Sequence, residues 1–118
     1  MVEFDCEPLS GRGKPIHAII EEGGYCAVDW GDAHFEFPYA LIDGILANVF
    51  IDENWHPLGS YRNNPSGVGL YIREQEICSL HSPQFASAIA PIMVELGLLI
   101  SRPSTTIING IELKRVID

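Results

Sequence analysis

Apolar and polar side chains alternate between Pro15 and Phe37, which is the pattern of half-buried β-strands. Two dipeptides interrupt the alternation, Gly23-Gly24 and Gly31-Asp32. Both suit two-residue hairpin turns, in which positive φ angles are required. The segment is therefore predicted to fold as a three-stranded antiparallel meander.

The two predicted turns fix a register for this meander. Ile19 would lie opposite Val28 in the first hairpin, and Asp29 would lie opposite His34 in the second. Because successive side chains point to opposite faces of a strand, one face is expected to be apolar and to belong to the core. The residues expected on that core face are Ile19, Cys26, Val28, Trp30, Ala33, Phe35 and Phe37. The residues expected on the outer face are Ala18, Ile20, Glu22, Tyr25, Ala27, Asp29, His34 and Glu36.

Helical spacing of apolar residues follows directly, from Pro38 to Phe50. Pro38 suits the first turn of a helix, whereas Gly44 lowers helix stability by about 1 kcal/mol relative to Ala. A helix is predicted over this segment. A shorter helix that ends near Ala47, followed by a short strand through Ile51, fits the pattern as well.

A second helix is predicted to begin near Ser82. Serine is a good N-cap, and Pro83 suits the first turn. Apolar residues then recur at helical spacing, and Gly97 is a natural C-terminal cap. Pro91 lies inside this pattern. Because proline removes a backbone donor and clashes with the preceding turn, at a cost of about 3 kcal/mol, we expect a kink or a break there.

The remaining apolar segments predict strands. Val68–Arg73 and Glu76–Leu80 are strand-like, and Asn109-Gly110 is a hairpin signal between Thr105–Ile108 and Ile111–Val116. The elements together predict an α+β fold. We expect a mainly antiparallel sheet, formed by the N-terminal three-stranded meander and the C-terminal hairpin, with one or two helices covering one face.

The composition fits a single domain. The 118 residues are 47% hydrophobic, which is enough apolar surface for one core, and two separate cores would be too small to be stable. A single globular α+β domain is therefore expected over residues 1–118.

A cytoplasmic protein is the expectation from the remaining features. The longest apolar stretch, residues 86–100, is interrupted by polar residues and proline, whereas a membrane-spanning helix needs about 20 apolar residues. The N-terminus is acidic where a secretory signal would be basic. Cys6, Cys26 and Cys78 are odd in number and widely spaced, which favours reduced thiols over a disulfide framework. No cofactor motif is recognised.

The charge is strongly negative and unevenly distributed. The formal net charge is −9, and residues 1–60 hold 11 acidic and 2 basic side chains, against 5 of each in residues 61–118. Direct binding to nucleic acid is not expected, because phosphate contacts need a basic surface. The charge favours either a basic protein partner or solubility alone.

A long polar segment between Asp52 and Gly67 is the first candidate site. It predicts a loop of a length that is often functional. Its mixture of aromatic, arginine and amide side chains is typical of binding surfaces. The candidate binding residues are Trp55, His56, Tyr61, Arg62, Asn63 and Asn64. Alternatively, Trp55 and Leu58 simply attach the loop to the core.

The outer face of the predicted meander is the second candidate. Asp29 and His34 are expected to be cross-strand neighbours, with Glu36 two residues further along. A carboxylate beside an imidazole can orient a general base, and the three side chains together could bind a metal ion. The alternative is a solvated outer face without a function.

Two shorter patterns are weaker. Cys78 and His81 have a zinc-ligand spacing, but no second pair of ligands accompanies them, and in a strand they would point to opposite faces. Gly11-Arg12-Gly13-Lys14-Pro15 could cradle a phosphate, but the flanking elements of a P-loop are missing, so a surface turn is the preferred interpretation.

Two classes of function follow from these patterns. The first is a binding protein without chemistry of its own, of the inhibitor, immunity or accessory type, that recognises a basic partner. The second is a small-molecule-binding protein or small enzyme whose pocket uses Asp29, His34 and Glu36. A homodimer is compatible with both classes, because Ile20, Tyr25 and Ala27 would leave apolar surface on the outer face.

Overall fold

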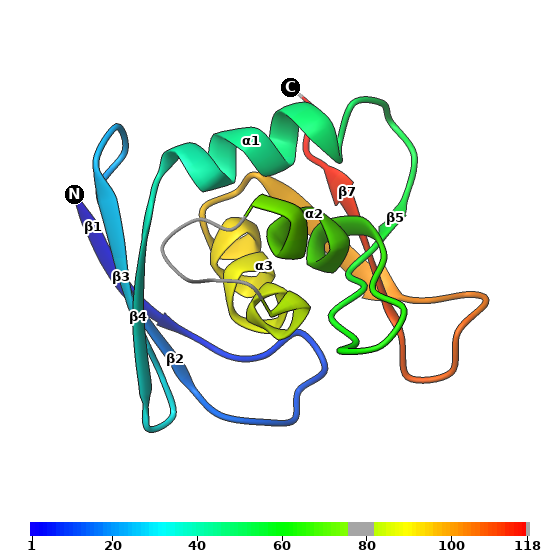
Figure 1. Ribbon diagram of the computed structural model, residues 1–118, viewed down its shortest axis with the longest axis horizontal. Helices are drawn as coiled ribbons and strands as arrows, with labels where there is room; N and C mark the ends of the chain where they lie inside the picture. Colours follow the sequence, from blue (N-terminus) through cyan, green and yellow to red (C-terminus); the bar gives the residue numbers. More distant parts are fainter. Residues whose placement is uncertain (76–81, 118) are drawn as a thin grey trace.

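Two antiparallel sheets lie on either side of the helices in a computed structural model of the chain, which describes residues 1–75 and 82–117 (Figure 1). The first sheet is a meander of β1 (Val2–Cys6), β2 (Ile16–Ile20), β3 (Tyr25–Trp30) and β4 (Ala33–Pro38), in that order. The second has the order β5 (His56–Pro57), β7 (Ile111–Arg115) and β6 (Leu99–Pro103). The helices are α1 (Ala40–Asn48), α2 (Gly67–Gln75) and α3 (Ala86–Glu95), with the short 3₁₀ helix η2 (Pro83–Phe85) directly before α3. The chain is α+β as predicted. The prediction of one sheet with one or two helices is wrong, because the meander and the C-terminal hairpin lie in separate sheets and three α-helices are described. The meander has four strands instead of three, because the segment of β1 is also extended.

The predicted register of the second hairpin is confirmed. Asp29 pairs with His34, and Trp30 pairs with Ala33 on either side of the Gly31-Asp32 turn, where Gly31 has a φ of +61°. The buried residues of this hairpin are Cys26, Val28, Phe35 and Phe37, as expected. Trp30 is only half-buried and Ala33 is exposed, since both lie at the end of the sheet.

The predicted register of the first hairpin is wrong by one residue. Ala18, not Ile19, pairs with Val28, so Ile16, Ala18 and Ile20 occupy the core face. The loop has three residues instead of two: Glu21 N–H donates to Tyr25 C=O (3.2 Å), and Gly24 N–H donates to Glu21 C=O (2.9 Å). The apolar set Ile16, Ala18 and Ile20 explains this choice, because the alternative set would have turned His17 into the core together with Ile19.

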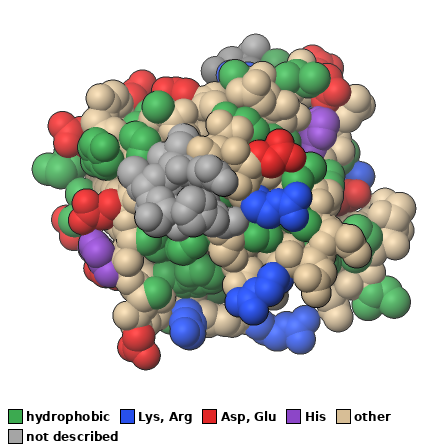
Figure 2. All heavy atoms as spheres, viewed as in Figure 1, with side chains coloured by type: hydrophobic (Ala, Val, Ile, Leu, Met, Phe, Trp, Pro, Cys, Tyr) green, Lys and Arg blue, Asp and Glu red, His purple; other side chains and the backbone are tan. Residues whose placement is uncertain are grey.

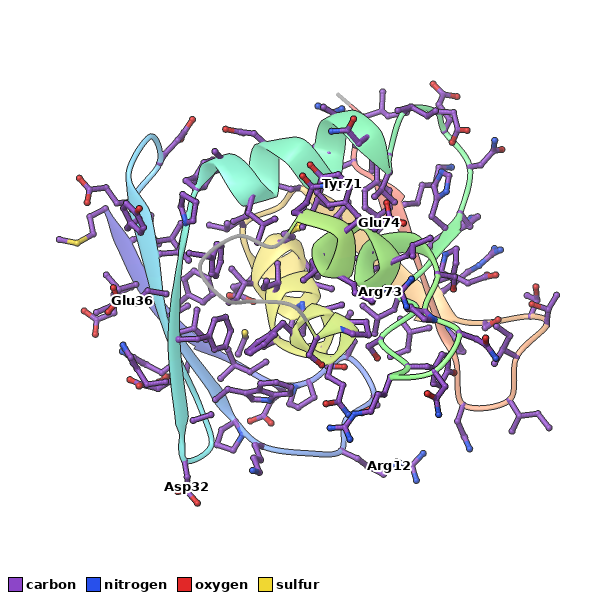
Figure 3. All side chains as sticks on the ribbon, viewed as in Figure 1. Arg12, Asp32, Glu36, Tyr71, Arg73 and Glu74 are labelled. Carbon is purple, nitrogen blue, oxygen red and sulfur yellow. The ribbon has the colours of Figure 1, made fainter. Side chains whose placement is uncertain are left out.

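Helix α1 lies in the segment predicted to be helical, but it is shorter than Pro38 to Phe50. Pro38 is the last residue of β4, and the helix ends at Asn48, close to the end near Ala47 that the alternative gave. The short strand of that alternative is not formed, since no strand lies between α1 and β5 in this described part of the chain. Its buried residues are Leu41, Ile42, Ile45 and Leu46. Gly44 has a packing role, since a Cβ at this position would lie 2.3 Å from the hydroxyl oxygen of Tyr71, which points from α2 toward α1 (Figure 3).

Helix α2 lies where a strand was predicted over Val68–Arg73, so that prediction is wrong. The apolar positions of this segment satisfy both periods, and Val68, Gly69 and Ile72 are buried with helical i, i+1, i+4 spacing. The segment packs against α1 and α3, and this packing favours the helix over the strand. The strand predicted over Glu76–Leu80 lies outside the described residues.

Helix α3 is buried on all sides. Every residue from Ala88 to Met93 is buried, and the helix contacts β1 of the first sheet and β6 of the second. The predicted start near Ser82 is confirmed for η2, whose N-cap Ser82 accepts a hydrogen bond from Gln84 N–H, and α3 follows directly at Ala86. The predicted end is confirmed, since Leu98 N–H donates to Met93 C=O around Gly97. The helix runs without a break through Pro91.

The C-terminal hairpin differs from its prediction. Strand β7 is present, but its partner is β6, and Thr105–Ile108 belongs to the connecting loop. Ile108 is 90% exposed, whereas Leu113 of β7 is buried. A turn is present at Asn109-Gly110, and Asn109 has a φ of +62°. Gly110 N–H donates to Ile107 C=O, so the turn lies within the loop and does not join two strands directly.

No helix within residues 1–75 and 82–117 has the length and apolar character needed to cross a membrane.

The burial of α3 predicts a large effect of truncation there. Ile89→Ala should lower the free energy of unfolding by about 2–5 kcal/mol, because it removes buried methyl groups and leaves a cavity. Urea denaturation monitored by circular dichroism measures this value. The exposed residue Ile108 is the matched control, and Ile108→Ala should change stability by less than about 0.5 kcal/mol. Equal effects of the two substitutions would contradict this arrangement.

Candidate functional site

Polar side chains cross the outer face of the meander in register. Asp5, His17, Asp29 and His34 are paired from strand to strand across all four strands, so carboxylates and imidazoles alternate along this row. Glu3 and Glu36 stand at the two ends of the next row, with Ile19 and Ala27 between them. We call the six ionisable residues the acidic face; they are Glu3, Asp5, His17, Asp29, His34 and Glu36.

His34 confirms the predicted grouping of Asp29, His34 and Glu36. Its Nδ1 lies 2.8 Å from Asp29 Oδ1, and its Nε2 lies 3.0 Å from Glu36 Oε2. The hydrogen bond to Glu36, and then the one to Asp29, raise the pKa of His34 above its ordinary value.

His17 repeats this arrangement and was not expected as a site residue. Its Nδ1 lies 2.5 Å from Asp5 Oδ1, and its Nε2 lies 2.9 Å from Glu3 Oε2. The bond to Asp5 and then the bond to Glu3 raise the pKa of His17. This cluster was not predicted, because the register predicted for the first hairpin did not place His17 beside Asp29. The alternation of Val2, Glu3, Phe4 and Asp5 is the signal that could have revealed β1 and its two carboxylates.

This geometry favours ion pairing over catalysis. Both ring nitrogens of each histidine face a carboxylate, which suits a charged imidazolium that donates twice and leaves neither nitrogen available as a base. The side chains of Asp29, His34 and Glu36 are 55–59% exposed, so solvent screens them. Among residues 1–75 and 82–117, no group of three His, Cys, Asp or Glu side chains is placed to hold a metal ion.

The six candidate residues of the long loop lie in separate places. Trp55 lies under the Arg102 guanidinium, 4.1 Å from the ring centre, with Lys114 Nζ at 5.9 Å. Tyr61 lines a cleft between the two sheets, and Arg62 approaches Gln84 Oε1 at 3.5 Å. Asn63 and Asn64 are exposed. Leu58 is buried in the core. Leu58 therefore attaches the loop to the core, as the alternative interpretation expected.

His56 belongs to the structural part of this loop. Its Nε2 lies 2.8 Å from Asp52 Oδ1, and its ring packs edge-on against Phe50 at 5.4 Å between centres. The backbone N–H of Asn54, and then His56, lower the pKa of Asp52. These contacts hold the start of the loop against β5.

The cleft between the sheets is the second feature of note. We call it the inter-sheet cleft; it has a volume of about 490 Å³. Arg12, Gly13 and Lys14 of the turn over residues 11–15 contribute to one wall, so this turn is part of a cavity. Figure 2 shows several basic side chains in the lower part of the visible face and acidic ones along the edge formed by the meander.

Comparisons with known protein families, with characterised proteins and with solved structures found no match to this chain.

Cys78 and His81, the pair with zinc-ligand spacing, lie outside the described residues. Of the other cysteines, Cys6 and Cys26 are free thiols, and burial raises the pKa of each to about 11. Neither is therefore suited to act as a thiolate nucleophile.

Titration by NMR should show His34 with a pKa above its ordinary value of 6.5. Glu36→Gln should lower that pKa more than Asp29→Asn, because the Glu36 bond contributes most. A raised pKa in the folded state stabilises the protein below pH 6.5, and this stabilisation disappears as the pH rises through the raised value. His17 provides the internal control for Glu36→Gln, since Glu36 lies two strands away and is not one of its hydrogen-bond partners. A His34 titration that is insensitive to both substitutions would contradict the observed pairing.

Proposed function

We propose that this chain is a small cytoplasmic binding protein without chemistry of its own, whose acidic face docks onto a basic partner protein. It would be of the inhibitor, immunity or accessory type. One observation carries the proposal: four carboxylates stand in register on the uncovered face of the meander, while the helices lie on its other side (Figure 1).

The charge of this face supports a basic partner. Its four carboxylates exceed its two imidazoles even when both histidines are protonated, so the face stays negative over the physiological range of pH. Surface charge of one sign steers the encounter with a partner of opposite charge and disfavours partners of like charge. The bonds to the histidines orient the carboxylates on this face.

Apolar side chains on the same face supply a centre for the contact. Ile19 and Ala27 lie half-buried between the carboxylates of Glu3 and Glu36, and Tyr25 is 60% exposed on the same face of β3. Interfaces commonly combine an apolar centre, in which tyrosine is enriched, with a charged rim. The acidic face has this composition.

A homodimer through this face is less well supported. Ile20, one of the three residues on which that expectation rested, is buried in the core. A two-fold contact would also place the same four carboxylates against each other, which costs free energy.

A pocket built on Asp29, His34 and Glu36 is also less well supported. These side chains stand on the open outer face, and Glu36 points away from the helices in Figure 3. The inter-sheet cleft lies on the other side of the meander, and none of the three lines it.

Photo-crosslinking in lysate of the native host can identify the partner. A photoreactive amino acid replaces Ala27, at the centre of the acidic face, or the exposed Ala47 on α1 as a control. We expect a basic protein to be captured from position 27 and not from position 47. Capture from both positions alike, or of acidic proteins only, would contradict the proposal.

Affinity of the purified partner then provides the quantitative test. Asp5→Asn with Asp29→Asn should weaken binding by at least tenfold, which corresponds to about 1.4 kcal/mol. Raising the salt concentration should weaken binding of the native chain as well. The matched control is Glu53→Gln with Glu74→Gln, which removes two exposed carboxylates elsewhere and should leave the affinity unchanged. Equal losses in the two double variants would show that only net charge is recognised.

A further inference from the structure

The inter-sheet cleft is a cavity of ligand size that the acidic face does not use. Its volume of about 490 Å³ lies within the range of roughly 300–1,000 Å³ typical of small-molecule sites. Segments far apart in the sequence form its walls: the β1–β2 loop, the end of the β3–β4 hairpin, the loop after β5, the first turn of α3 and the β6–β7 loop.

The walls of the cleft are mainly apolar. Trp30 lies on the inner side of the meander and packs against Phe85, with 6.4 Å between ring centres. Ile111 is the first residue of β7 and Leu58 directly follows β5. Tyr61, further along the loop after β5, is 47% exposed. Such a wall suits a flat aromatic or branched aliphatic group, because burial of apolar surface contributes about 25 cal/mol per Å².

Two cations accompany these apolar walls. Arg12 and Lys14 line the cleft, and its lining includes no Asp or Glu within the described chain, although the formal net charge of the protein is −9. Neither cation forms an ion pair within residues 1–75 and 82–117. Arg102, by contrast, pairs with Glu112 at 2.9 Å and stacks on Trp55.

Local contacts hold the Lys14 stem and the backbone at Arg12. The Lys14 stem crosses the hairpin tip at Gly31, where a Cβ would lie 2.2 Å from Lys14 Cδ. Gly31 N–H donates to Pro15 C=O at 3.1 Å, which ties the loop to the hairpin. At Arg12, the Ser10 hydroxyl donates to Arg12 C=O (2.9 Å) and accepts from Arg12 N–H (3.2 Å). A ligand therefore meets a preformed loop.

The nearby carboxylates do not cancel this positive charge. Asp32 is exposed at the tip of the β3–β4 turn and points away from the molecule, while Arg12 extends from the loop at the rim (Figure 3). Exposed charges are screened by salt over about 8 Å at physiological ionic strength. The carboxylates of the acidic face stand on the opposite side of the meander.

We propose that the inter-sheet cleft binds a small amphipathic anion. Its aromatic or branched aliphatic body packs beside Trp30, and its carboxylate or phosphate group lies at Arg12 and Lys14. Ser60, Ser87 and Asn109 line the same cleft and offer hydrogen bonds to polar atoms of the body. This site does not depend on the proposed docking of a partner to the acidic face.

Three probes separate the parts of this proposal. The protein, labelled with ¹⁵N, is titrated with 1-naphthyl phosphate, with 1-naphthol and with inorganic phosphate, and the Trp30 indole N–H signal is followed by NMR. We expect saturable shifts with 1-naphthyl phosphate, and affinities at least tenfold weaker for the other two probes. Absence of saturable shifts with 1-naphthyl phosphate would overturn the site. Equal binding of 1-naphthol would show that the charge plays no part, and equal binding of inorganic phosphate would show that the apolar walls play none.

Paired variants test the role of the cations. Arg12→Gln with Lys14→Gln should weaken 1-naphthyl phosphate by at least tenfold and change the affinity for 1-naphthol by less than twofold. Arg73→Gln with Arg115→Gln removes two exposed cations elsewhere and should leave both affinities unchanged. All four positions are exposed, so thermal unfolding should show that each variant is folded. Equal losses in the two double variants would overturn the assignment of Arg12 and Lys14.

Discussion

The middle of helix α3, Ala88 to Met93, is buried around its whole circumference, and both sheets depend on this burial. Each sheet has one apolar face, and a sheet with an uncovered apolar face is not stable in water. Phe35 of the meander packs edge-on against Phe85 directly before the helix, at 4.8 Å between ring centres. At the other end, the turn at Gly97 leads the chain straight into β6 of the second sheet. One helix thus fills the space that two sheets share.

Pro91 fits within this helix because of what lies beside it. Proline has no N–H, so the Ser87 carbonyl loses its usual donor one turn later. A buried carbonyl without a partner is costly, but Ser87 is only half-buried and lines the inter-sheet cleft. Solvent in the cleft can supply the missing hydrogen bond. The expected break is therefore avoided, and the helix remains continuous through the core.

Local signals in the sequence predicted the second hairpin but not the first. At Gly31-Asp32, turn chemistry and the apolar pattern agree, so the register of β3 and β4 follows from about ten residues. At Gly23-Gly24 a two-residue and a three-residue loop are both compatible with the glycines. The choice depends on burying Ile16, Ala18 and Ile20, and on the carboxylates that β1 brings to His17. These are contacts with another strand, which the local pattern does not contain.

The same distinction separates the two candidate sites. Asp29, His34 and Glu36 belong to one hairpin, and their grouping could be predicted from alternation alone. The inter-sheet cleft joins residues from Pro8 to Ile111, and its walls exist only after α3 has brought the two sheets together. From the sequence alone, the turn that holds Arg12 and Lys14 could therefore be predicted only as a surface turn. Its place at the mouth of an apolar cavity is a property of the tertiary fold.

The β3–β4 hairpin serves both sites because a strand has two faces. Asp29 and Trp30 are consecutive, yet Asp29 points outward to His34 and Trp30 points inward to the cleft. A one-residue shift in this hairpin would exchange the two faces and destroy both sites together. Burial of Val28 and Phe37 prevents that shift, since it would expose the core. The packing that stabilises the fold thus also keeps the acidic face and the cleft on opposite sides of one sheet.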